Sequence, residues 1–385
     1  MIFDFDATNK YMNLKDFKTT KERREFIEKS LKIKLENISK AQVDDETTIH
    51  CENLVGATTL PLGVAGPLTM KNEKFKMKNY YIPLATTEGA LVASVNRGCK
   101  AINLSGGAKT YLENVGTTRG PVFETAGIKE SNEFKTWLDE NFKLLKSEAE
   151  KTSSYLKLKK LGIRIAGTYV YVRFYFDTTD AMGMNMATIA TDKISMFIEK
   201  NTNVKCLAVS GNFCIDKKPA WLNFIAGRGK KVWADIILKK EIVKEVLKTT
   251  PEKFFDIWLA KCMIGSAMSG SLGFNAHFAN IVAAFFAATG QDLAHVVEGS
   301  MGVTTSKVLK NGDLYVSVYL PAVMIGTVGG GTKLKTKQEA LSIIGVKNSI
   351  ELAEVLGGAV LAGEISLLAS LSEGSLSKAH EKLGR

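Results

Sequence analysis

Apolar residues in the first 50 positions of the chain recur at roughly the spacing of a helix, among many charged residues. They are Leu14, Phe17, Phe26, Ile27, Leu31 and Leu35. This pattern predicts a helical N-terminal region, residues 1–50. From Cys51 onward the residues become small and apolar, and glycines and prolines interrupt the stretch 54–68. We therefore expect a turn-rich entry into a second region there.

The next pattern predicts a helix over Thr86–Asn103. Its apolar face holds four residues at helical spacing, namely Leu91, Val95, Cys99 and Ile102. Ser94 and Arg97 are three residues apart, so they should share another face of the same helix.

Residues 121–208 have the pattern of a self-contained α+β block. A helical stretch, Ser131–Leu161, leads to the segment Ile163–Phe176, which is rich in strand formers. A second helix should begin near Met182, and the strand Cys206–Val209 closes the block. The apolar face expected for that helix consists of Met182, Met186, Ile189 and Met196. This order predicts a small split βαβ, or ferredoxin-like, module inserted into a larger domain.

The last region is dominated by small and apolar residues. The stretch Gly265–Asn275 precedes Ala279–Thr289, which we expect to form a buried helix, and Glu351–Leu371 predicts a second apolar helix. The predicted fold class is therefore α+β. It combines the helical N-terminal region with a large domain (51–120 and 209–385), built around a central buried helix, and an inserted small domain (121–208).

The composition fits a soluble globular protein of two or three domains. The chain has 385 residues, of which 45% are hydrophobic and 24% charged. Its five cysteines, at irregular spacing, argue for reduced and buried thiols rather than disulfides or zinc. The N-terminus has no signal-peptide pattern, and the longest apolar runs, such as Ile281–Ala288, are far too short to cross a bilayer. We expect a cytoplasmic protein without membrane contact.

The net charge of +11 raises the question of a nucleic-acid partner. However, the lysines are spread along helical segments among glutamates, and the sequence has no arginine-rich or aromatic-interleaved stripe. The charge equally suits a small polyanionic ligand, which a positive surface would attract. We therefore expect small-molecule ligands and no nucleic acid.

The segment Val204–Ala220 carries the first candidate for chemistry. It begins with the pattern of a buried strand, breaks at Gly211 and then presents Asp216, Lys217 and Lys218 side by side. A desolvated lysine can stabilise a developing oxyanion, because its charge is weakly screened. A solvated pair of surface lysines is an equally open interpretation.

Two glycine-containing turns are candidates for phosphate binding. The first, Asp180–Met186, places Gly183 before a helix start, where free N–H groups attract phosphate. It does not match GxGxxG, so an ordinary Rossmann site is not indicated. The second, Thr327–Thr332, holds three glycines that could form an anion-binding nest or a flexible turn.

Four further polar residues are candidates, and each has a structural alternative. Glu88 could simply be an acid in the first turn of a helix, where the helix dipole favours it, and Asp292 could be an acid in a surface turn. Asn280 could be a buried amide whose hydrogen bonds are satisfied in the core, and His380 could be a surface residue on a polar tail. The histidines show no HxH or HExxH spacing, so no metal site is expected. One lysine, two acids, one tail histidine and two glycine turns together suit the reduction of a carbonyl by a dinucleotide, without a metal.

Six motifs in order resemble those of class I hydroxymethylglutaryl-CoA (HMG-CoA) reductase, in its soluble, archaeal-like form. They are Glu52-Asn-Leu-Val-Gly, Ala85-Thr-Thr-Glu-Gly, Asp180-Ala-Met-Gly-Met-Asn, Asp216-Lys-Lys-Pro, Gly290-Gln-Asp and Gly326-Thr-Val-Gly-Gly-Gly-Thr. With the tail histidine they extend from about residue 51 to 380, and the Asp-Lys-Lys-Pro form looks like class I rather than class II. The resemblance implies reduction of the HMG-CoA thioester by two NADPH, through a hemithioacetal and an aldehyde, to mevalonate and free CoA. This reaction belongs to the mevalonate pathway of isoprenoid biosynthesis.

The resemblance also implies catalytic roles. Lys217 would stabilise the oxyanion formed on reduction, and Glu88 would protonate the carbonyl oxygen in the aldehyde step. Asp292 would hydrogen-bond both of them, and His380 would protonate the departing CoA thiolate.

The resemblance assigns binding residues as well. Those for the hydroxymethylglutaryl moiety are Arg119, Ser210, Asp216, Lys218, Lys261 and Asn280. Those for CoA are Ser94, Asn96, Arg97 and Lys248. Those for NADPH are Ser153, Asp180, Met182, Gly183, Met184, Asn185, Val328, Gly329 and Gly330, so the inserted domain would be the cofactor domain. The site would lie between two subunits of a homodimer or of a larger tetramer.

Two departures from the family pattern matter. Animal members carry an arginine that pairs with the 2′-phosphate of NADPH where this chain has Ser154, and Lys157 or Lys159 is the available substitute. The transmembrane region and the phosphorylatable C-terminal serine segment of other members are not expected here. Two alternatives stay open: a relative that uses NADH in the oxidative direction, and a CoA- or nucleotide-binding sensor without turnover.

Overall fold

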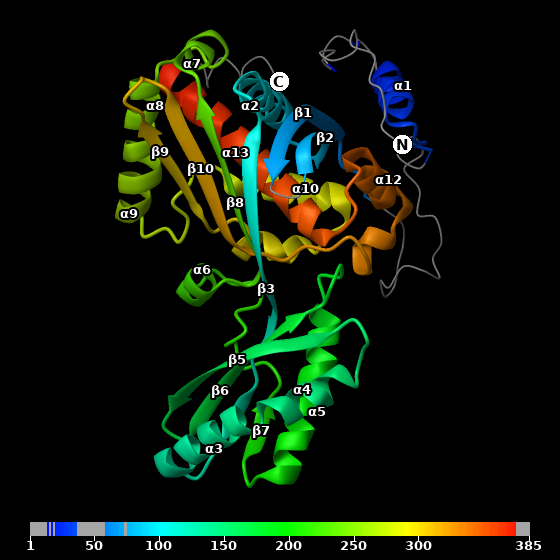
Figure 1. Cartoon of the computed structure of the whole chain (residues 1–385), viewed down its shortest axis with the longest axis vertical. Coiled ribbons are helices and arrows are strands. Elements are labelled where there is room, and N and C mark those ends of the chain that lie inside the picture. The colour runs from blue at the N-terminus through cyan, green and yellow to red at the C-terminus, as the bar shows by residue number, and fades with distance from the viewer. Residues whose placement is uncertain (1–13, 15–16, 18–19, 37–57, 73–74, 375–385) are drawn as a thin grey trace.

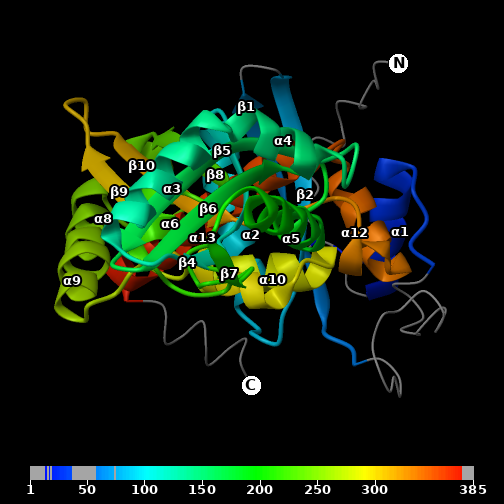
Figure 2. The ribbon, with the colours of Figure 1, turned by 90° about the horizontal axis from the view of Figure 1, so that it is seen from below.

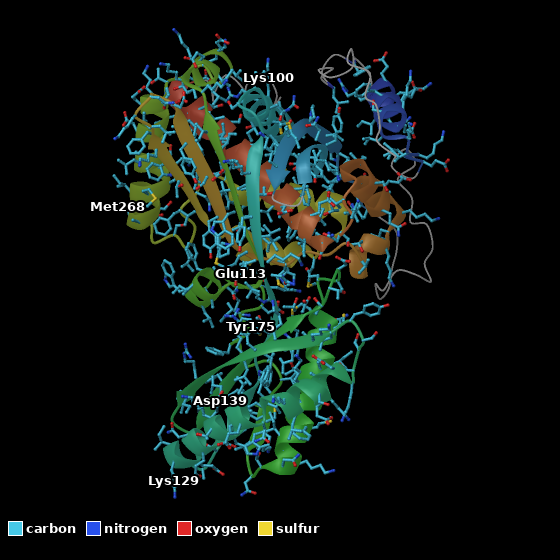
Figure 3. The ribbon with its side chains drawn as sticks, in the orientation of Figure 1. Lys100, Glu113, Lys129, Asp139, Tyr175 and Met268 are labelled. Carbon is cyan, nitrogen blue, oxygen red and sulfur yellow. The ribbon has the colours of Figure 1, made fainter. Side chains whose placement is uncertain are left out.

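The computed structural model of the chain describes residues 14, 17, 20–36, 58–72 and 75–374. Its elements form two lobes, an upper one with the long helix α13 and a lower one with α3, α4 and α5 (Figure 1). Strand β3 (Ala108–Arg119) passes from the upper lobe into the lower one and pairs with strands of both. The side chains of Glu113 and Tyr175 lie near this junction (Figure 3).

The upper lobe contains a sheet with the strand order β2-β1-β3-β8-β10-β9. Besides β3, its strands are β1 (Leu62–Asn72), β2 (Phe75–Ala85), β8 (Gly229–Leu238), β9 (Val303–Val308) and β10 (Leu314–Val323). The β1–β3 pairing is parallel, and the other pairings are antiparallel. Along the first part of β10, buried and half-buried residues alternate, so one face of the sheet covers the core.

Helix α13 (Ser349–Glu373) is the central buried element of this lobe. Nearly every residue between its start and Ala369 is buried, and the helix packs against α2 (Leu91–Leu104), α10 (Phe278–Thr289) and β8. The two apolar helices that the sequence predicts in the last region are therefore confirmed. Helix α2 starts five residues later than expected, and its predicted apolar face is buried.

The length and apolar character of α13 contradict one expectation from the sequence. Among the described helices, α13 alone is long and apolar enough to cross a membrane by length and composition. Most of its apolar stretch is buried inside the upper lobe, so the protein itself covers this surface.

The lower lobe has its own hydrophobic core, which includes Phe123, Phe174 and Ile194. Its elements are β4 (Val122–Glu124), α3 (Ile128–Glu140), α4 (Phe142–Glu150), β5 (Lys157–Ala166), β6 (Tyr169–Asp177), α5 (Met184–Asn201) and β7 (Lys205–Ala208). The strands pair antiparallel in the order β7-β4-β6-β5. Seen from below, this lobe lies in front of much of the upper sheet (Figure 2).

Two predictions for this lobe are wrong. The expected single helix over Ser131–Leu161 is divided at Asn141 and ends at Glu150, and β5 begins at Lys157, where pairing with β6 overrides the helical pattern. The predicted apolar face of α5 is also wrong, because Ile189 and Met196 are 61% and 57% exposed. Ala187, Ala190, Ile194 and Ile198 are buried instead, so the helix packs on the core of this lobe with a different face.

The N-terminal region contributes helix α1 (Thr20–Leu31), as the sequence predicts for this part of residues 1–50. Ile27 and Leu35 pack with Leu14 and Ile343 in a third, small cluster. Figures 1 and 2 both show α1 beside α12 (Lys335–Ile344). The remaining elements are α6 (Trp221–Ala226), α7 (Lys240–Glu245), α8 (Pro251–Trp258), the π-helix η4 (Leu259–Gly265), α9 (Ser266–Met268), η5 (Leu293–His295), α11 (Val296–Gly299) and η6 (Gly330–Lys333).

The cysteines in the described part of the chain are free thiols. Cys99, Cys214 and Cys262 are buried, and Cys206 is half-buried. Burial raises the pKa of Cys99 and of Cys262 to about 12, so both thiols are protonated and unreactive at neutral pH. Cys51 lies outside the described residues.

Candidate active site

The loop that presents Lys217 does not follow a buried strand. Strand β7 lies at the edge of the lower sheet and is largely exposed, so the buried-strand interpretation of Val204–Val209 is wrong. Tertiary hydrogen bonds hold the loop instead. The Thr118 hydroxyl donates to the Cys214 carbonyl at 2.9 Å, and the Asn223 amide donates to the Ile215 carbonyl at 2.8 Å.

The backbone of this loop is held in an unfavourable conformation. Asn212, Ile215 and Lys217 have φ values of 61°, 51° and 57°, in the left-handed region that non-glycine residues rarely adopt. Each such residue costs on the order of 1 kcal/mol, and the cost persists only where the surroundings fix the conformation. Strain of this kind is often found at functional sites, where it aims a side chain.

Lys217 is aimed at Asp292. Its Nζ lies 2.7 Å from Asp292 Oδ2, and the two side chains are 40% and 35% exposed. Asp292 follows Gly290, which ends α10 in a left-handed conformation, and Asp292 Oδ1 accepts the N–H of Ala294 at 3.1 Å. The carboxylate is therefore oriented by its own turn and by the lysine, beyond the role of a simple surface turn acid.

The charge of Lys217 controls the ionisation of Asp292. Partial burial alone would raise the pKa of Asp292, but the hydrogen bonds from Lys217 and from the Ala294 N–H outweigh it, with a contribution from His295. The net effect is a pKa below the usual value for an aspartate. Asp292 is therefore ionised at neutral pH and pairs with the ammonium group.

A buried charge network lies behind this pair. The fully buried Arg228 pairs with Asp216 Oδ1 at 2.9 Å and with Glu298 Oε1, and its Nε donates to the Thr118 hydroxyl at 2.9 Å. His295 Nδ1 lies 2.7 Å from the same Glu298 oxygen. Buried charges are tolerated when they are paired in this way. The network fixes Asp216, which is adjacent to Lys217.

Sequence reasoning missed Arg228, Glu298 and the role of His295. Two weak signals were present: an arginine between two glycines, and a histidine and a glutamate three residues apart just after Gly290-Gln-Asp. Neither signal identifies its partner, because Glu298 is 70 residues from Arg228 and the contact of Arg228 with Asp216 crosses a strained loop. Arg119, which was predicted, lies 3.6 Å from Asp216 Oδ2.

Three residues of this network have the spacing of metal ligands. The ligand atoms of Asp216, His295 and Glu298 all lie within 4.8 Å of one another. However, the Arg228 guanidinium already pairs with both carboxylates, so a positive charge occupies the position that a cation would need. This donor set therefore does not fit a metal ion.

The two predicted glycine turns lie side by side. Thr327 donates its N–H to the Asp180 carbonyl at 2.8 Å, and Ala181 and Val328 form a β-bridge. Gly183, with φ of 87°, begins α5, and no atom lies within 4 Å of the place where a side chain of Gly329 or Gly330 would start. Free helix N–H groups and open glycine backbone together fit a phosphate-containing cofactor.

The Asp180 side chain has a structural role in this arrangement. Its Oδ1 accepts the N–H of Ser349 at the start of α13, at 2.8 Å, and the Ser349 hydroxyl donates to the Thr179 carbonyl at 3.1 Å. These bonds tie the predicted cofactor turn to the central helix of the upper lobe.

Other predicted site residues are not joined to Lys217 in the described part of the chain. The half-buried Glu88 carboxylate makes no hydrogen bond or ion pair there, and its backbone N–H donates to the Thr86 hydroxyl at 3.0 Å. Asn280 lies in the first turn of α10, 3.4 Å from His277 Nδ1, and Lys261 is exposed on η4. Ser210 and Lys218 are exposed on the Lys217 loop.

The predicted CoA-binding residues fall on two segments. Arg97 pairs with Glu373 at 2.9 Å and donates to Ser366, and Ser94 also bonds the Ser366 hydroxyl, at 3.0 Å. Asn96 Oδ1 accepts the N–H of Gly66, and Lys248 is exposed on the loop after α7. Ser94, Asn96 and Arg97 thus help to hold α2 against α13 and β1, in addition to their predicted role in CoA binding.

Some predicted positions are peripheral or not described. Ser153 lies in the loop between α4 and β5, where its hydroxyl accepts the N–H of Tyr155. His380 and the Glu52-Asn-Leu-Val-Gly motif lie outside the described residues.

Comparison with known proteins places the chain in a family. The family profile described as hydroxymethylglutaryl-coenzyme A reductase matches residues 19–385. The 3-hydroxy-3-methylglutaryl-coenzyme A reductase of Methanothermobacter thermautotrophicus is 50% identical over 369 residues, which is 94% of this chain and 92% of that protein. The enzyme of the same name from Methanocaldococcus jannaschii is 48% identical over 377 residues, covering 95% and 93% of the two chains.

A solved structure has the same fold. The class II 3-hydroxy-3-methylglutaryl-CoA reductase from Streptococcus pneumoniae, bound to NADPH in open conformations, matches with a TM-score of 0.77 at 18% identity. The match covers 93% of this chain and 98% of that one, and at this identity it shows the fold alone. The mixed α/β architecture with its mainly antiparallel sheet is thus shared, and the sequence matches show that the chain belongs to the hydroxymethylglutaryl-coenzyme A reductase family.

Proposed function

We propose that this protein reduces HMG-CoA to mevalonate and CoA with two NADPH, which is the reaction that the sequence motifs imply. The observation that carries the proposal is the Lys217–Asp292 pair, 2.7 Å apart on a strained loop beside a buried charge network. Family membership supplies the reaction, and this pair supplies a cation where a thioester oxygen gains negative charge.

Lys217 is the proposed electrophilic group. A carbonyl oxygen that approaches Lys217 Nζ would meet a full positive charge that Asp292 holds in place. The attraction between the two would become stronger as the oxygen becomes an oxyanion. Removing such a donor costs about 10²–10³ in rate. Glu88 remains the proposed proton donor in the aldehyde step and His380 the proposed donor to the CoA thiolate.

Substrate binding is proposed at the residues around this loop. Arg119 and Asp216 form one edge of the site, and Ser210 and Lys218 lie on the same loop. Lys261 and Asn280 complete the proposed set for the hydroxymethylglutaryl moiety, and CoA is proposed to contact Ser94, Asn96, Arg97 and Lys248. A positively charged protein favours the approach of both phosphate-rich ligands.

The cofactor site is proposed where the two glycine turns meet. Bound NADPH supplies the hydride for each reduction step. The open backbone at Gly329 and Gly330 and the start of α5 would receive its phosphates. Asp180, Met182, Met184, Asn185 and Val328 line the same turns, and Ser153 is proposed at the edge of the site.

The preference for NADPH is proposed to depend on a lysine, because Ser154 carries no charge. Lys159 already donates to the Asn114 carbonyl, whereas Lys157 at the start of β5 is exposed. We therefore propose Lys157 as the partner of the 2′-phosphate. Replacing it with methionine should raise the KM for NADPH and leave that for NADH unchanged.

A homodimer with shared active sites is proposed on the basis of an exposed apolar surface. Leu259, Ile264 and Met268 of η4 and α9 are exposed, and Met268 lies on the outer flank of the upper lobe (Figure 3). Large apolar side chains gathered on one face favour association. A site shared by two protomers would explain why Lys261 on this segment and Glu88 are not joined to Lys217 within one chain.

Several finer assignments belong to the same proposal. The small domain, residues 121–208, is proposed to be a ferredoxin-like cofactor domain, supported by the strand order β7-β4-β6-β5 with α3, α4 and α5. Residues 51–120 and 209–385 would form the substrate domain and residues 1–50 a helical addition. The class I assignment is supported by Asp216-Lys-Lys-Pro, and a cytoplasmic location by the archaeal relatives.

The test is to follow the absorbance of the reduced cofactor with HMG-CoA, using NADPH and NADH in parallel. Faster oxidation of NADPH supports the proposal. A strong preference for NADH, with mevalonate oxidation as the faster direction, would favour the oxidative alternative. Binding of CoA without oxidation of either cofactor would support the remaining alternative, a CoA- or nucleotide-binding sensor.

A further inference from the structure

The buried side chain of His295 connects the buried network with the Lys217–Asp292 pair. Its Nδ1 lies 2.7 Å from Glu298 Oε1, and its Nε2 lies 3.7 Å from Asp292 Oδ2. The imidazole is fully buried. Because the Glu298 oxygen also pairs with Arg228, it acts as an acceptor, so the Nδ1 atom of His295 donates its proton to it. The ionised Asp292 carboxylate is also an acceptor only, so contact with it requires a proton on Nε2 as well, and His295 acts here as an imidazolium whose positive charge helps to lower the pKa of Asp292.

The other ring nitrogen has an unusual environment. His295 Nε2 is buried and has no hydrogen-bond partner among the described residues. Leaving a buried polar atom unsatisfied costs roughly 1–3 kcal/mol, so natural proteins rarely retain one without a reason. The nearest acidic oxygen is Asp292 Oδ2, the same atom that pairs with Lys217. A shift of about 0.5 Å would bring the two atoms within hydrogen-bond distance.

The charged and titratable groups that face Asp292 come from two elements. Lys217 faces it from the loop before α6, and His295 faces it from η5. Behind His295 lie Glu298 of α11 and Arg228, and beyond them Asp216 and Arg119. His295 is therefore the side chain through which the buried Arg228–Glu298 pair touches Asp292.

We propose that His295 is a positioning residue of the proposed reductase reaction: anchored at Nδ1 by Glu298, it presents Nε2 to Asp292 and so fixes the orientation of the Asp292–Lys217 pair. This inference rests on the proposed function. The loop around Lys217 is strained and half-exposed, so the lysine needs a carboxylate that does not move. His295 ties that carboxylate to a rigid, buried ion pair.

Two amide variants separate the two ring nitrogens. In His295→Asn the amide reaches the place of Nδ1 and can keep the bond to Glu298, but nothing faces Asp292. In His295→Gln the longer side chain places an amide near the position of Nε2. We expect kcat to fall about ten- to a hundredfold in His295→Asn, with little change in the KM for HMG-CoA, because a misplaced group costs up to about a hundredfold. His295→Gln should recover most of kcat.

The opposite pattern overturns the inference. If His295→Asn kept the kcat of the unchanged protein, or if both variants lost kcat in proportion to their loss of thermal stability, His295 would only fill space. Unfolding midpoints of both variants are measured alongside the kinetics to make this comparison.

A second measurement does not depend on turnover. The chain has four histidines, so the ¹⁵N spectrum of the histidine-labelled protein is simple, and His295→Gln identifies the His295 signals by their loss. We expect Asp292→Asn to change the Nε2 shift of His295, whereas Asp139→Asn, at an exposed position of α3, should not change it. An unchanged Nε2 shift in Asp292→Asn would overturn the contact. Failure of the unchanged protein to oxidise NADPH with HMG-CoA would instead reject the proposed reaction.

Discussion

The carbonyl oxygen of Asp180 accepts the backbone N–H of Thr327 at 2.8 Å, and this bond joins two glycine turns that are far apart in the sequence. The contact is close because Gly326 has no side chain. A Cβ atom there would lie 2.5 Å from the Met182 nitrogen and 2.8 Å from the Asp180 oxygen. The geometry of the proposed cofactor site therefore depends on a glycine that would touch no cofactor itself.

Gly326→Ala should consequently weaken cofactor binding. Overpacking costs about 1–3 kcal/mol, and the turns must separate to relieve it. We expect the KM for NADPH to rise about tenfold or more, with a smaller effect on the KM for HMG-CoA. Gly127→Ala is the matched control, since no atom lies within 4 Å of its added methyl group and its backbone is extended. Equal kinetics in both variants would show that the two turns do not form the cofactor site.

Lys217→Met should abolish most turnover without unfolding the protein. The variant keeps the length of the side chain and removes the charge proposed to stabilise the oxyanion, so kcat should fall about 10²–10³. Because the Lys217–Asp292 pair is partly exposed, the unfolding midpoint of this variant should fall only by the small contribution of that pair. Lys129→Met, at an exposed position of α3, controls for loss of a surface charge. Unchanged reduction of either HMG-CoA or free mevaldehyde by Lys217→Met would remove the lysine from the mechanism.

The Lys217–Asp292 pair should make stability depend on acid pH. The folded pKa of Asp292 lies below the ordinary aspartate value of 3.8, so the pair contributes stability above that value, and the contribution is lost as the pH falls through the folded pKa. Denaturant unfolding of the protein and of Asp292→Asn should therefore differ most at neutral pH and converge in acid. A difference that stays constant down to the lowest pH would mean that the carboxylate is not stabilised by the lysine.

The contact between α2 and α13 should be intolerant of any side chain at Gly98. A methyl group there would overlap the carbonyl of Ala362, and backbone of a central buried helix cannot move away easily. We expect Gly98→Ala to lower the free energy of unfolding by about 3 kcal/mol or more, at the upper end of overpacking costs. Gly162→Ala, whose methyl group would meet one ring atom of Tyr175 at 3.9 Å, should be nearly neutral. Chemical denaturation of the two variants tests this.

The parts of the fold that could be predicted from sequence are those where local pattern and burial agree. Helix α13 and the apolar face of α2 follow from their hydrophobic spacing, because both pack against apolar neighbours over their whole length. The buried face of α5 was predicted wrongly, because Ala187, Ala190, Ile194 and Ile198 are buried while Ile189 and Met196 are exposed. Local apolar spacing alone does not distinguish these two faces. The apolar sequence of β7 predicts a buried strand, yet β7 lies exposed at the edge of its sheet. Tertiary strand pairing alone determines that position.

The candidate site shows the same division. Lys217 and Asp292 were both predicted, and the structure places them in contact. The strained conformation of the Lys217 loop could not be foreseen, because Asn212, Ile215 and Lys217 are not glycines and local sequence disfavours positive φ at such residues. Arg228 was missed because its role depends on ion pairs with Asp216 and Glu298, and only the folded chain brings these three residues together.

Lys230 should make the protein more stable in alkaline solution. This lysine is buried at the start of β8, where its Nζ lies 3.4 Å from the Ile325 carbonyl. Burial lowers its pKa from 10.5 to about 8, although the carboxylates of Asp177 and Asp180 act in the opposite direction. Between those two pH values the unfolded chain binds more protons than the folded one, so the free energy of unfolding should rise with pH across that window.

Lys230→Met tests the sign of this effect. The variant removes the buried charge and keeps an apolar stem of similar length, so it should be at least as stable as the unchanged protein below about pH 8 and should lack the alkaline rise. Lys231→Met, at the next residue of β8, removes a half-buried lysine that pairs with Glu113, and it should keep the rise. Urea unfolding at several pH values between 8 and 10.5 makes the comparison. If Lys230→Met were strongly destabilised at neutral pH, the carboxylates would dominate over burial, and Lys230 would be charged in the folded state because it holds Asp177 and Asp180 in place.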